Sequence, residues 1–413
     1  MNRRGFLLRT AGSIAGLFLS RSVRAAASNG LAPAAGVDSS AAGPGTAPPP
    51  SSGTPADSSA ASRGAARGPT ASLAVGGDTT LGYNLEAHFD QQVQAGVPKE
   101  QLWPLYFAGV RSILDQADVA LVNLECPFTE RGTKLTKNFN FRARRELVRI
   151  LSEGSVDVVS VANNHAADYG RAGLKDTLKT LDGAGIEHFG AGMNLREARR
   201  PAILARKGLK LGFLGYYFQA EPDMLEPEEV YATQHHPGVA GCYKDLECVR
   251  AQITEDLEHL VSKVDVAIPY FHWGKEGSYD VQPYQVELAH LCVDLGCKAV
   301  MGSHPHRLQG VEVYREAPIF YSLGNFVYGG IKEPKDTLTA IARLEVGRDR
   351  VKAELVPVQF TRWPEAPFQP FVLEAEAREE ALRRAASYAQ GFERTLPQLE
   401  AYRAATPAAE AKP

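Results

Sequence analysis

Short apolar runs alternate with segments of helical periodicity from residue 71 to about residue 301, and this alternation constrains the fold more than any other feature. The expected strands are 71–76, 118–124, 156–161, 211–216, 265–271 and 297–301, and the expected helices lie near 98–117, 144–153, 171–183, 243–263 and 281–295. Strands that alternate with helices are typical of α/β proteins, in which the core sheet is largely parallel. We therefore predict an α/β fold.

The sequence changes character after residue 310. Residues 311–360 read as hairpin-like strands, so we expect antiparallel strands to join the sheet late. Residues 371–404 are rich in Glu, Ala, Arg and Leu and predict one or two packing helices. Residues 219–241 contain three prolines and a pair of histidines, which indicates an inserted loop. We divide this part of the chain into a domain over 71–366 and a C-terminal helical extension with a tail over 367–413.

The first 27 residues contain the three parts of an export signal in the order that export requires. Arg3 and Arg4, which resemble a twin-arginine signal, precede an apolar stretch at 11–20, and Ala25-Ala26-Ala27 offers an A-x-A cleavage site. The apolar stretch is shorter than the ~20 residues that a mature anchor needs. Residues 28–70 are mainly Ala, Gly, Pro and Ser and predict a disordered linker. We expect an exported protein, periplasmic or extracellular, with no permanent membrane span after signal removal.

Composition argues against several classes of protein. The net charge of -3 and the lack of a basic patch interleaved with aromatic residues argue against a nucleic-acid partner. The five cysteines are an odd number without framework spacing, so at least one has no intramolecular partner. None lies in CxxC spacing, so they predict neither a disulfide scaffold nor a thiolate zinc site.

Polar side chains follow five of the expected strands, in chain order Asp78, Glu125, the Asn163-Asn164-His165 turn, His272, and His304 with His306. In open α/β sheets, ligands bind beyond the carboxyl ends of the strands. Carboxylates, amides and imidazoles are the ligand types that divalent transition metals prefer. We expect an extended backbone at His304 and His306, because residues i and i+2 of a strand point the same way. The pattern predicts a metal site at this edge of the sheet.

Each of these residues alone has a simpler explanation. Asp78 could cap the turn that follows it, Glu125 could be a solvated strand end, the Asn163-Asn164-His165 run could be an ordinary turn, and His272 could pack against Trp273. The inference rests on their occurrence together rather than on any one of them.

Seven ordered motifs resemble those of the CapA family of poly-gamma-glutamate capsule biosynthesis proteins. They are GGDTTLG (76–82), NLECPFT (123–129), VANNHAADYG (161–170), GAGMNLREARRP (190–201), HWGKEG (272–277), GSHPHRLQG (302–310) and YSLGNFVYG (321–329). The family is similar to the calcineurin-like metallophosphatases. The resemblance therefore implies a four-layer metallophosphatase-like α/β sandwich with mixed central sheets, followed by the helical extension.

The resemblance also implies a role for each candidate residue. Asp78 and His306 would bind one metal, Glu125 would bridge two metals, and Asn164, His272 and His304 would bind the second. His165 matches the histidine that protonates the leaving group. Asn163 and Glu276 would support the ligands, with Glu276 orienting a ligand ring. The implied cofactors are divalent metal ions, expected to be two, and the ligand types suit Mn, Fe or Zn alike.

One residue departs from the metallophosphatase pattern. Those enzymes carry D-x-H at the first strand, whereas here the third residue is Thr80, and the CapA family also lacks that histidine. The resemblance therefore leaves open whether the first metal site is filled. A two-metal site predicts a hydrolase of phosphoester or related bonds. The alternative is a non-catalytic accessory protein that binds or guides an anionic polymer such as poly-gamma-glutamate. The expected partners are an anionic substrate or polymer and capsule-synthesis membrane proteins.

Overall fold

The computed structural model describes residues 68–220 and 226–403. The expected export signal and all of the expected linker except residues 68–70 lie outside this range. Within the described ranges, no helix combines the length and the apolar character that crossing a membrane would require.

The first sheet has eight strands in the described part of the chain, in the order β16-β15-β14-β1-β2-β3-β4, with β13 paired to β1. Its parallel part comprises β1 (Ala71–Thr80), β2 (Val119–Leu124), β3 (Val158–Ser160), β4 (Glu187–Phe189) and β13 (Asn325–Tyr328). Its antiparallel part comprises β14 (Leu338–Val346), β15 (Val351–Gln359) and β16 (Phe371–Val372). Of the late strands in this sheet, β14, β15 and β16 therefore join antiparallel, as expected, whereas β13 joins parallel.

The second sheet has the order β11-β12-β10-β9-β7-β6. Its strands are β6 (Ala202–Arg206), β7 (Leu209–Phe218), β9 (Val266–Trp273), β10 (Val300–Ser303), β11 (Val311–Tyr314) and β12 (Ala317–Phe320). The four inner strands are parallel, while β6 and β11 pair antiparallel at the edges. Every residue of β9 and β10 is buried, so these strands read as continuous apolar runs. A small sheet joins β5 (Ala191–Gly192) to β8 (Gly238–Val239).

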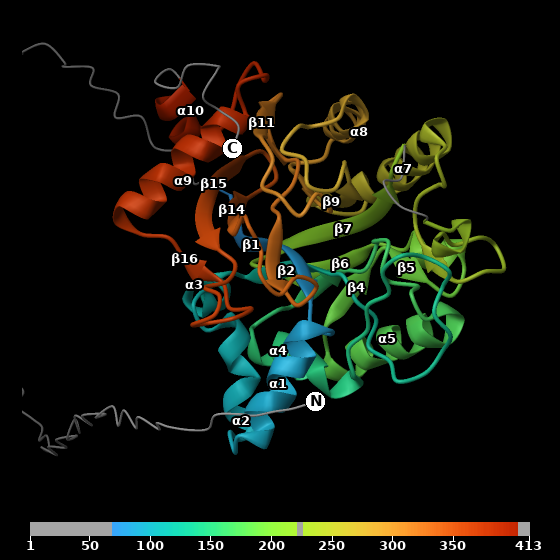
Figure 1. Cartoon of the computed structure of the whole chain (residues 1–413). Coiled ribbons are helices and arrows are strands. Elements are labelled where there is room, and N and C mark those ends of the chain that lie inside the picture. The colour runs from blue at the N-terminus through green and yellow to red at the C-terminus, as the bar shows by residue number, and fades with distance from the viewer. Residues whose placement is uncertain (1–67, 221–225, 404–413) are drawn as a thin grey trace, which may run out of the picture. The chain divides into compact units, whose positions relative to one another are not determined.

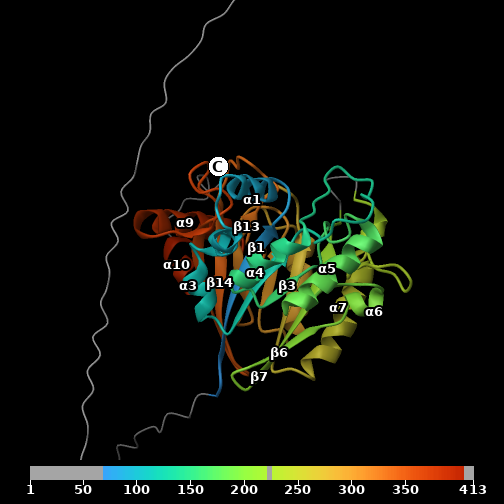
Figure 2. The same cartoon turned by 90° about the horizontal axis from the view of Figure 1, so that it is seen from below.

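Helices cover the outer face of each sheet (Figures 1 and 2). The first sheet is covered by α1 (Asn84–Gln94), α2 (Lys99–Leu102), η1 (Pro104–Phe107), α3 (Arg111–Gln116), η2 (Arg145–Leu147), α4 (Val148–Glu153) and α5 (Gly170–Ala184). The second is covered by α7 (Leu246–Val261) and α8 (Pro283–Asp294). Short helices α6 (Leu195–Ala198) and η3 (Glu228–Val230) lie in connections.

A third apolar core lies between the two sheets. It contains Val75 and Leu121 from the first sheet with Phe213 and Ile268 from the second. The C-terminal helices α9 (Ala375–Tyr388) and α10 (Pro397–Arg403) add buried side chains such as Leu382 to this core. The order helix, sheet, sheet, helix is a four-layer α/β sandwich, which confirms the predicted fold class.

Three expectations about local structure were wrong. The helix expected near 98–117 is divided into α2, η1 and α3, because Pro104 lacks the N–H that a continuous helix needs and begins a new turn instead. Strand β13 pairs parallel with β1 rather than forming a hairpin. The backbone at His304 and His306 is not extended, since β10 ends at Ser303 and both histidines have positive φ, at 105° and 55°.

The structure also contains one disulfide that the spacing of the cysteines did not predict. Cys242 and Cys248 are bonded where the inserted loop ends and α7 begins. Cys126, Cys292 and Cys297 are free and buried.

Candidate metal centre

The carboxyl ends of strands from both sheets meet at one place. Asp78 lies in β1, Glu125 follows β2 and Asn164 follows β3 in the first sheet, while His272 lies in β9 and His304 follows β10 in the second. The sequence argument placed these residues at one edge of a single sheet. In the structure they come from two sheets that face each other across the inter-sheet core.

Asp78, Glu125 and His306 form the first ligand group, in which one potential ligand atom from each residue lies within 4.8 Å of the others. His306 Nδ1 is 3.3 Å from Asp78 Oδ2, and His306 Nε2 is 3.8 Å from Glu125 Oε1. Two carboxylates and one imidazole form a donor set that suits a divalent transition metal. This group could hold a metal ion.

Glu125, His272 and His304 form the second ligand group, which satisfies the same distance limit. His272 Nε2 lies 2.9 Å from His304 Nδ1 and 3.5 Å from Glu125 Oε1. Asn164 Oδ1 lies 2.9 Å from the same His272 nitrogen, so an amide oxygen faces this group as well. Glu125 belongs to both groups.

The environment of Glu125 fits a shared cation ligand. Its side chain is fully buried, and neither carboxylate oxygen accepts a hydrogen bond from any residue in the described ranges. Burial and then the neighbouring Asp78 carboxylate raise the pKa of Glu125 well above its usual value. A buried carboxylate with both oxygens unsatisfied is costly, and a bound cation removes that cost.

The three histidines of the two ligand groups differ in the direction in which their pKa values are shifted. Burial, followed by the neighbouring histidines, lowers the pKa values of His272 and His304 well below the usual value, so both rings are neutral, the form in which an imidazole binds a metal. Burial also opposes a charge on His306, but the Glu125 and Asp78 carboxylates outweigh it and raise the pKa of His306 to about 10. The same negative potential attracts a metal cation.

His165 is held beside the groups without belonging to either. Its Nδ1 donates to Asp168 Oδ2 at 2.7 Å, which fixes the neutral tautomer and leaves Nε2 as the free nitrogen. Its ring packs against Phe141 with centroids 4.2 Å apart and the ring planes tilted by 35°. Burial lowers the pKa of His165 to about 4, although Asp168 acts in the opposite direction. The backbone N–H of His165 donates to Asn163 Oδ1, and Asn163 Nδ2 donates to the carbonyl of Leu124, so Asn163 fixes the turn.

Thr80 and Glu276 also lie at this place. Thr80 Oγ1 donates to the backbone carbonyl of Glu125 at 3.1 Å. Thr80, which stands where metallophosphatases carry a histidine, therefore holds the backbone of Glu125 in place. Glu276 Oε1 lies 3.9 Å from His306 Nε2, which places it beside the first ligand group.

Sequence reasoning missed several residues of the surrounding shell. Asn123 Nδ2 donates to Asp78 Oδ1 at 2.8 Å, and Asn325 Oδ1 and Tyr328 OH, both on β13, lie 2.9 and 3.3 Å from the nitrogens of His306. Gln219, from the inserted loop, contacts His304 Nε2. The sequence did contain a signal for Asn123, because it is an amide inside the otherwise apolar run VALVNL. A buried Asn needs polar partners, so other polar residues had to lie beside it.

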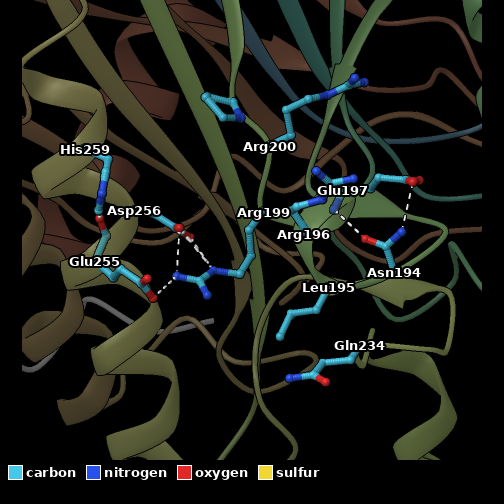
Figure 3. A pocket seen from close by; sticks show the side chains of 11 residues that line it. Asn194, Leu195, Arg196, Glu197, Arg199, Arg200, Gln234, Glu255, Asp256 and His259 are labelled. Atoms are coloured by element: carbon cyan, nitrogen blue, oxygen red, sulfur yellow. Dashed lines mark hydrogen bonds and ion pairs between the residues drawn. The ribbon is translucent and has the colours of Figure 1, made fainter.

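A wide groove of about 910 Å³ lies elsewhere, between the α6 region and α7, and includes none of the predicted site residues (Figure 3). Its acidic side chains are already paired: Arg199 contacts both Glu255 and Asp256, while Glu197 accepts from Asn194. Three arginines face three carboxylates in the lining, so no charge of either sign dominates.

The fold and the two ligand groups define an α/β sandwich protein with a candidate metal centre at its strand ends. The sequence model of the family described as bacterial capsule synthesis protein PGA_cap matches residues 72–329, which is more than half of the chain, and the chain belongs to this family. The predicted membership of the CapA family is confirmed.

Curated relatives agree with this assignment. The chain is 32% identical over 226 residues to the capsule biosynthesis protein CapA of Bacillus anthracis, covering 54% of this chain and 53% of that protein. It is 32% identical over 225 residues to the PGA biosynthesis protein CapA of Bacillus subtilis, covering 54% and 56%. It is 32% identical over 251 residues to a probable polyglutamine synthesis accessory protein of Mycobacterium tuberculosis, covering 58% and 64%. The chain thus spans little more than half the length of the first two relatives.

Proposed function

We propose that the protein is a metal-dependent hydrolase that uses two divalent cations. The observation that carries the proposal is the buried carboxylate of Glu125, which both ligand groups share and which no hydrogen bond from the described residues satisfies. Asp78 and His306 would hold one cation with Glu125, and His272, His304 and Asn164 would hold the other. Mn, Fe and Zn all suit this donor set.

The charge around the two ligand groups supports the binding of cations. The carboxylates in and beside the two groups are Asp78, Glu125, Asp168, Glu226 and Glu276, and Lys137 is the ammonium among them. These carboxylates outnumber the cationic groups Lys137 and His306, so the chain leaves negative charge that bound divalent cations would neutralise. Buried charge is stable only when it is compensated in this way.

The chain's own residues then divide the chemistry between them. Bound divalent cations supply Lewis acidity, which stabilises negative charge that develops on a phosphoryl or acyl oxygen. His165, held by Asp168 and Phe141, presents an unprotonated Nε2, which would take up the proton that the attacking water releases and pass it to the departing oxygen or nitrogen. Burial of the site excludes bulk water and strengthens these electrostatic interactions. We propose a phosphoester or a related bond as the substrate.

The test combines elemental analysis with a turnover assay. Purified protein should carry close to two divalent ions per chain and hydrolyse 4-nitrophenyl phosphate. His304→Ala should lose both bound metal and activity, whereas His259→Ala, at an exposed position on α7, should change neither. A His304→Ala protein that turns over at the wild-type rate without metal would refute the mechanism.

We also propose that the protein is exported and acts in the metabolism of a capsule or of poly-gamma-glutamate. The N-terminal sequence supports export, and the names of the relatives support the link to capsules. In a fractionation experiment, Arg3→Lys combined with Arg4→Lys should retain the protein in the cytoplasm. Normal export of that variant would exclude the twin-arginine route.

A second candidate function is that of a non-catalytic accessory protein, because one relative is described as a probable polyglutamine synthesis accessory protein. In this case the cations would hold the carboxylates of an anionic polymer without cleaving a bond, and capsule-synthesis membrane proteins would be the partners. Metal-loaded protein incubated with polyglutamate distinguishes the two functions. Retention of the intact polymer, together with no product from the aryl phosphate, would favour the accessory role.

A further inference from the structure

Lys137 is a buried ammonium that lies behind the candidate metal centre. Its side chain is 1% exposed, and a lysine is almost never buried to this degree unless it is paired. Its Nζ lies 2.8 Å from Asp168 Oδ1 and 3.3 Å from Glu226 Oε1, and it donates to the backbone carbonyl of Asn164 at 2.7 Å. One cation therefore joins three segments: its own loop, the turn after β3 and the inserted loop.

The contact with Asp168 leads to His165. The other carboxylate oxygen of Asp168 accepts hydrogen bonds from His165 Nδ1 at 2.7 Å and from the backbone N–H of Phe141 at 2.6 Å. Phe141 packs against the same imidazole ring. The position of the Asp168 carboxylate therefore determines where His165 Nε2 points, and Lys137 neutralises that carboxylate and holds it from the opposite side.

The contact with Glu226 leads to Asn164. Glu226 Oε1 accepts from Asn164 Nδ2 at 3.3 Å. When the NH₂ of this amide is held, its oxygen must point the other way, and Asn164 Oδ1 lies 2.9 Å from His272 Nε2. Lys137 thus supports the amide of the second ligand group through Glu226 and, directly, through the Asn164 carbonyl.

We propose that Lys137 is a positioning residue that sets two parts of the site at once: the proton-carrying histidine through Asp168, and the amide ligand through Glu226. The inference rests on the proposed hydrolase function and deepens it. Without the ammonium, two buried carboxylates would lose their shared counter-charge and repel each other. His165 and Asn164 would then lose their fixed orientations together, although Lys137 itself touches no reacting atom.

The experiment uses Lys137→Met in the full-length protein, because Met has similar volume and no charge. Rates are measured on phenyl phosphate, a poor leaving group, and on 4-nitrophenyl phosphate, a good one. A positioned general acid contributes roughly 10²- to 10⁴-fold where the leaving group needs a proton. We therefore expect kcat to fall about 100-fold for phenyl phosphate. For 4-nitrophenyl phosphate we expect kcat to fall by no more than about tenfold.

Metal binding provides a readout that does not depend on turnover. Loss of a residue that orients a ligand weakens metal affinity by about 10- to 100-fold. Calorimetric titration with Mn²⁺ should show this weakening for one of the two ions in Lys137→Met and leave the other unchanged. Glu226→Ala should reproduce the metal defect without the dependence on the leaving group, because it leaves the pair between Lys137 and Asp168 in place. This variant also serves if Lys137→Met does not fold.

The control is Lys99→Met, which removes a half-exposed lysine whose partner is Glu146 and should change neither readout. Equal losses on both phosphate esters with unchanged metal affinity would mean that Lys137 is only structural, and this result would overturn the inference. Wild-type behaviour of Lys137→Met and Glu226→Ala would also overturn it. A wild-type protein that neither binds metal nor hydrolyses either ester would instead refute the hydrolase proposal, and the inference would fall with it.

Discussion

At the scale of single residues, the candidate centre is built from groups that are unfavourable for folding. Glu125 is a buried carboxylate without hydrogen bonds from the described residues, and His304 and His306 both adopt positive φ. Backbone strain of this kind costs about 1–3 kcal/mol per residue and persists where the surrounding structure enforces it. Several unfavourable features at one place indicate a site maintained for function at the expense of stability.

We expect Glu125→Gln to have opposite effects on stability and on metal binding, because the buried carboxylate is unfavourable for folding and favourable for binding a cation. In chelator-treated protein the variant should be more stable than wild type by about 1–3 kcal/mol, because it removes a buried charge without changing the shape of the side chain. Added Mn²⁺ or Zn²⁺ should stabilise wild type much more than the variant. Urea unfolding with and without metal measures both effects. A metal-free variant that is less stable than wild type would show that Glu125 serves the fold itself.

The chemistry of the centre was predictable at this scale, whereas its supporting residues were not. Asp78, Glu125 and His272 could be selected because each interrupts or follows an apolar run. Lys137 lies in the segment TKLTKNFN (133–140), which is rich in other polar residues, so nothing in the local sequence distinguishes it. Its importance comes from contacts across 27 or more positions, such as that with the Asn164 carbonyl, which only the folded chain creates.

At the scale of elements, strands and helices were predictable where apolar periodicity was strong, as for α5, α7 and α8. Strand β13 was not, because four residues carry no signal for direction, and its parallel pairing with β1 depends on how the chain returns from the second sheet.

The connection that follows β13 is fixed by Asp336. Its carboxylate accepts from Tyr279 OH at 2.5 Å, from Arg384 on α9 at 3.0 Å and from the backbone N–H of Leu338 at 3.1 Å.

Asp336→Asn should therefore destabilise the protein in a pH-dependent way. Burial alone would raise the pKa of Asp336, but Tyr279 and the other donors outweigh it and lower the pKa below the unfolded value of about 3.9. A carboxylate with a depressed folded pKa contributes stability above its unfolded pKa, and this contribution is lost as the pH falls through the folded pKa. We expect a loss of about 1–3 kcal/mol at pH 7 that shrinks toward zero below pH ~4.

Urea unfolding at several pH values measures this difference. Asp349→Asn, at an exposed position between β14 and β15, is the matched control and should have a small effect throughout. A loss for Asp336→Asn that stays constant from neutral to acid pH would contradict the assigned role of its charge.

At the scale of the whole described unit, the candidate centre lies where the two sheets meet. Asp78 and Glu125 come from the first sheet and His272 and His304 from the second, so each cation would connect both sheets. The α/β class followed from the alternation of strands and helices. The assignment of strands to two sheets did not, because continuous apolar runs look the same in either sheet. Only the family resemblance implied the four layers.

Because the cations would link the two sheets, metal should stabilise the described unit as a whole. A ligand present at 100 times its Kd adds about 2.7 kcal/mol to the free energy of unfolding, which corresponds to roughly 4 °C in Tm for a domain of this size. We expect chelator-treated protein to gain at least this much with Mn²⁺ or Zn²⁺ and much less with Ca²⁺, which prefers oxygen ligands to imidazole. Differential scanning calorimetry should show a single unfolding transition whose Tm rises when metal is added. The Tm of His304→Ala should not change on addition of metal. Equal shifts in wild type and His304→Ala would place the bound ion somewhere other than between the sheets.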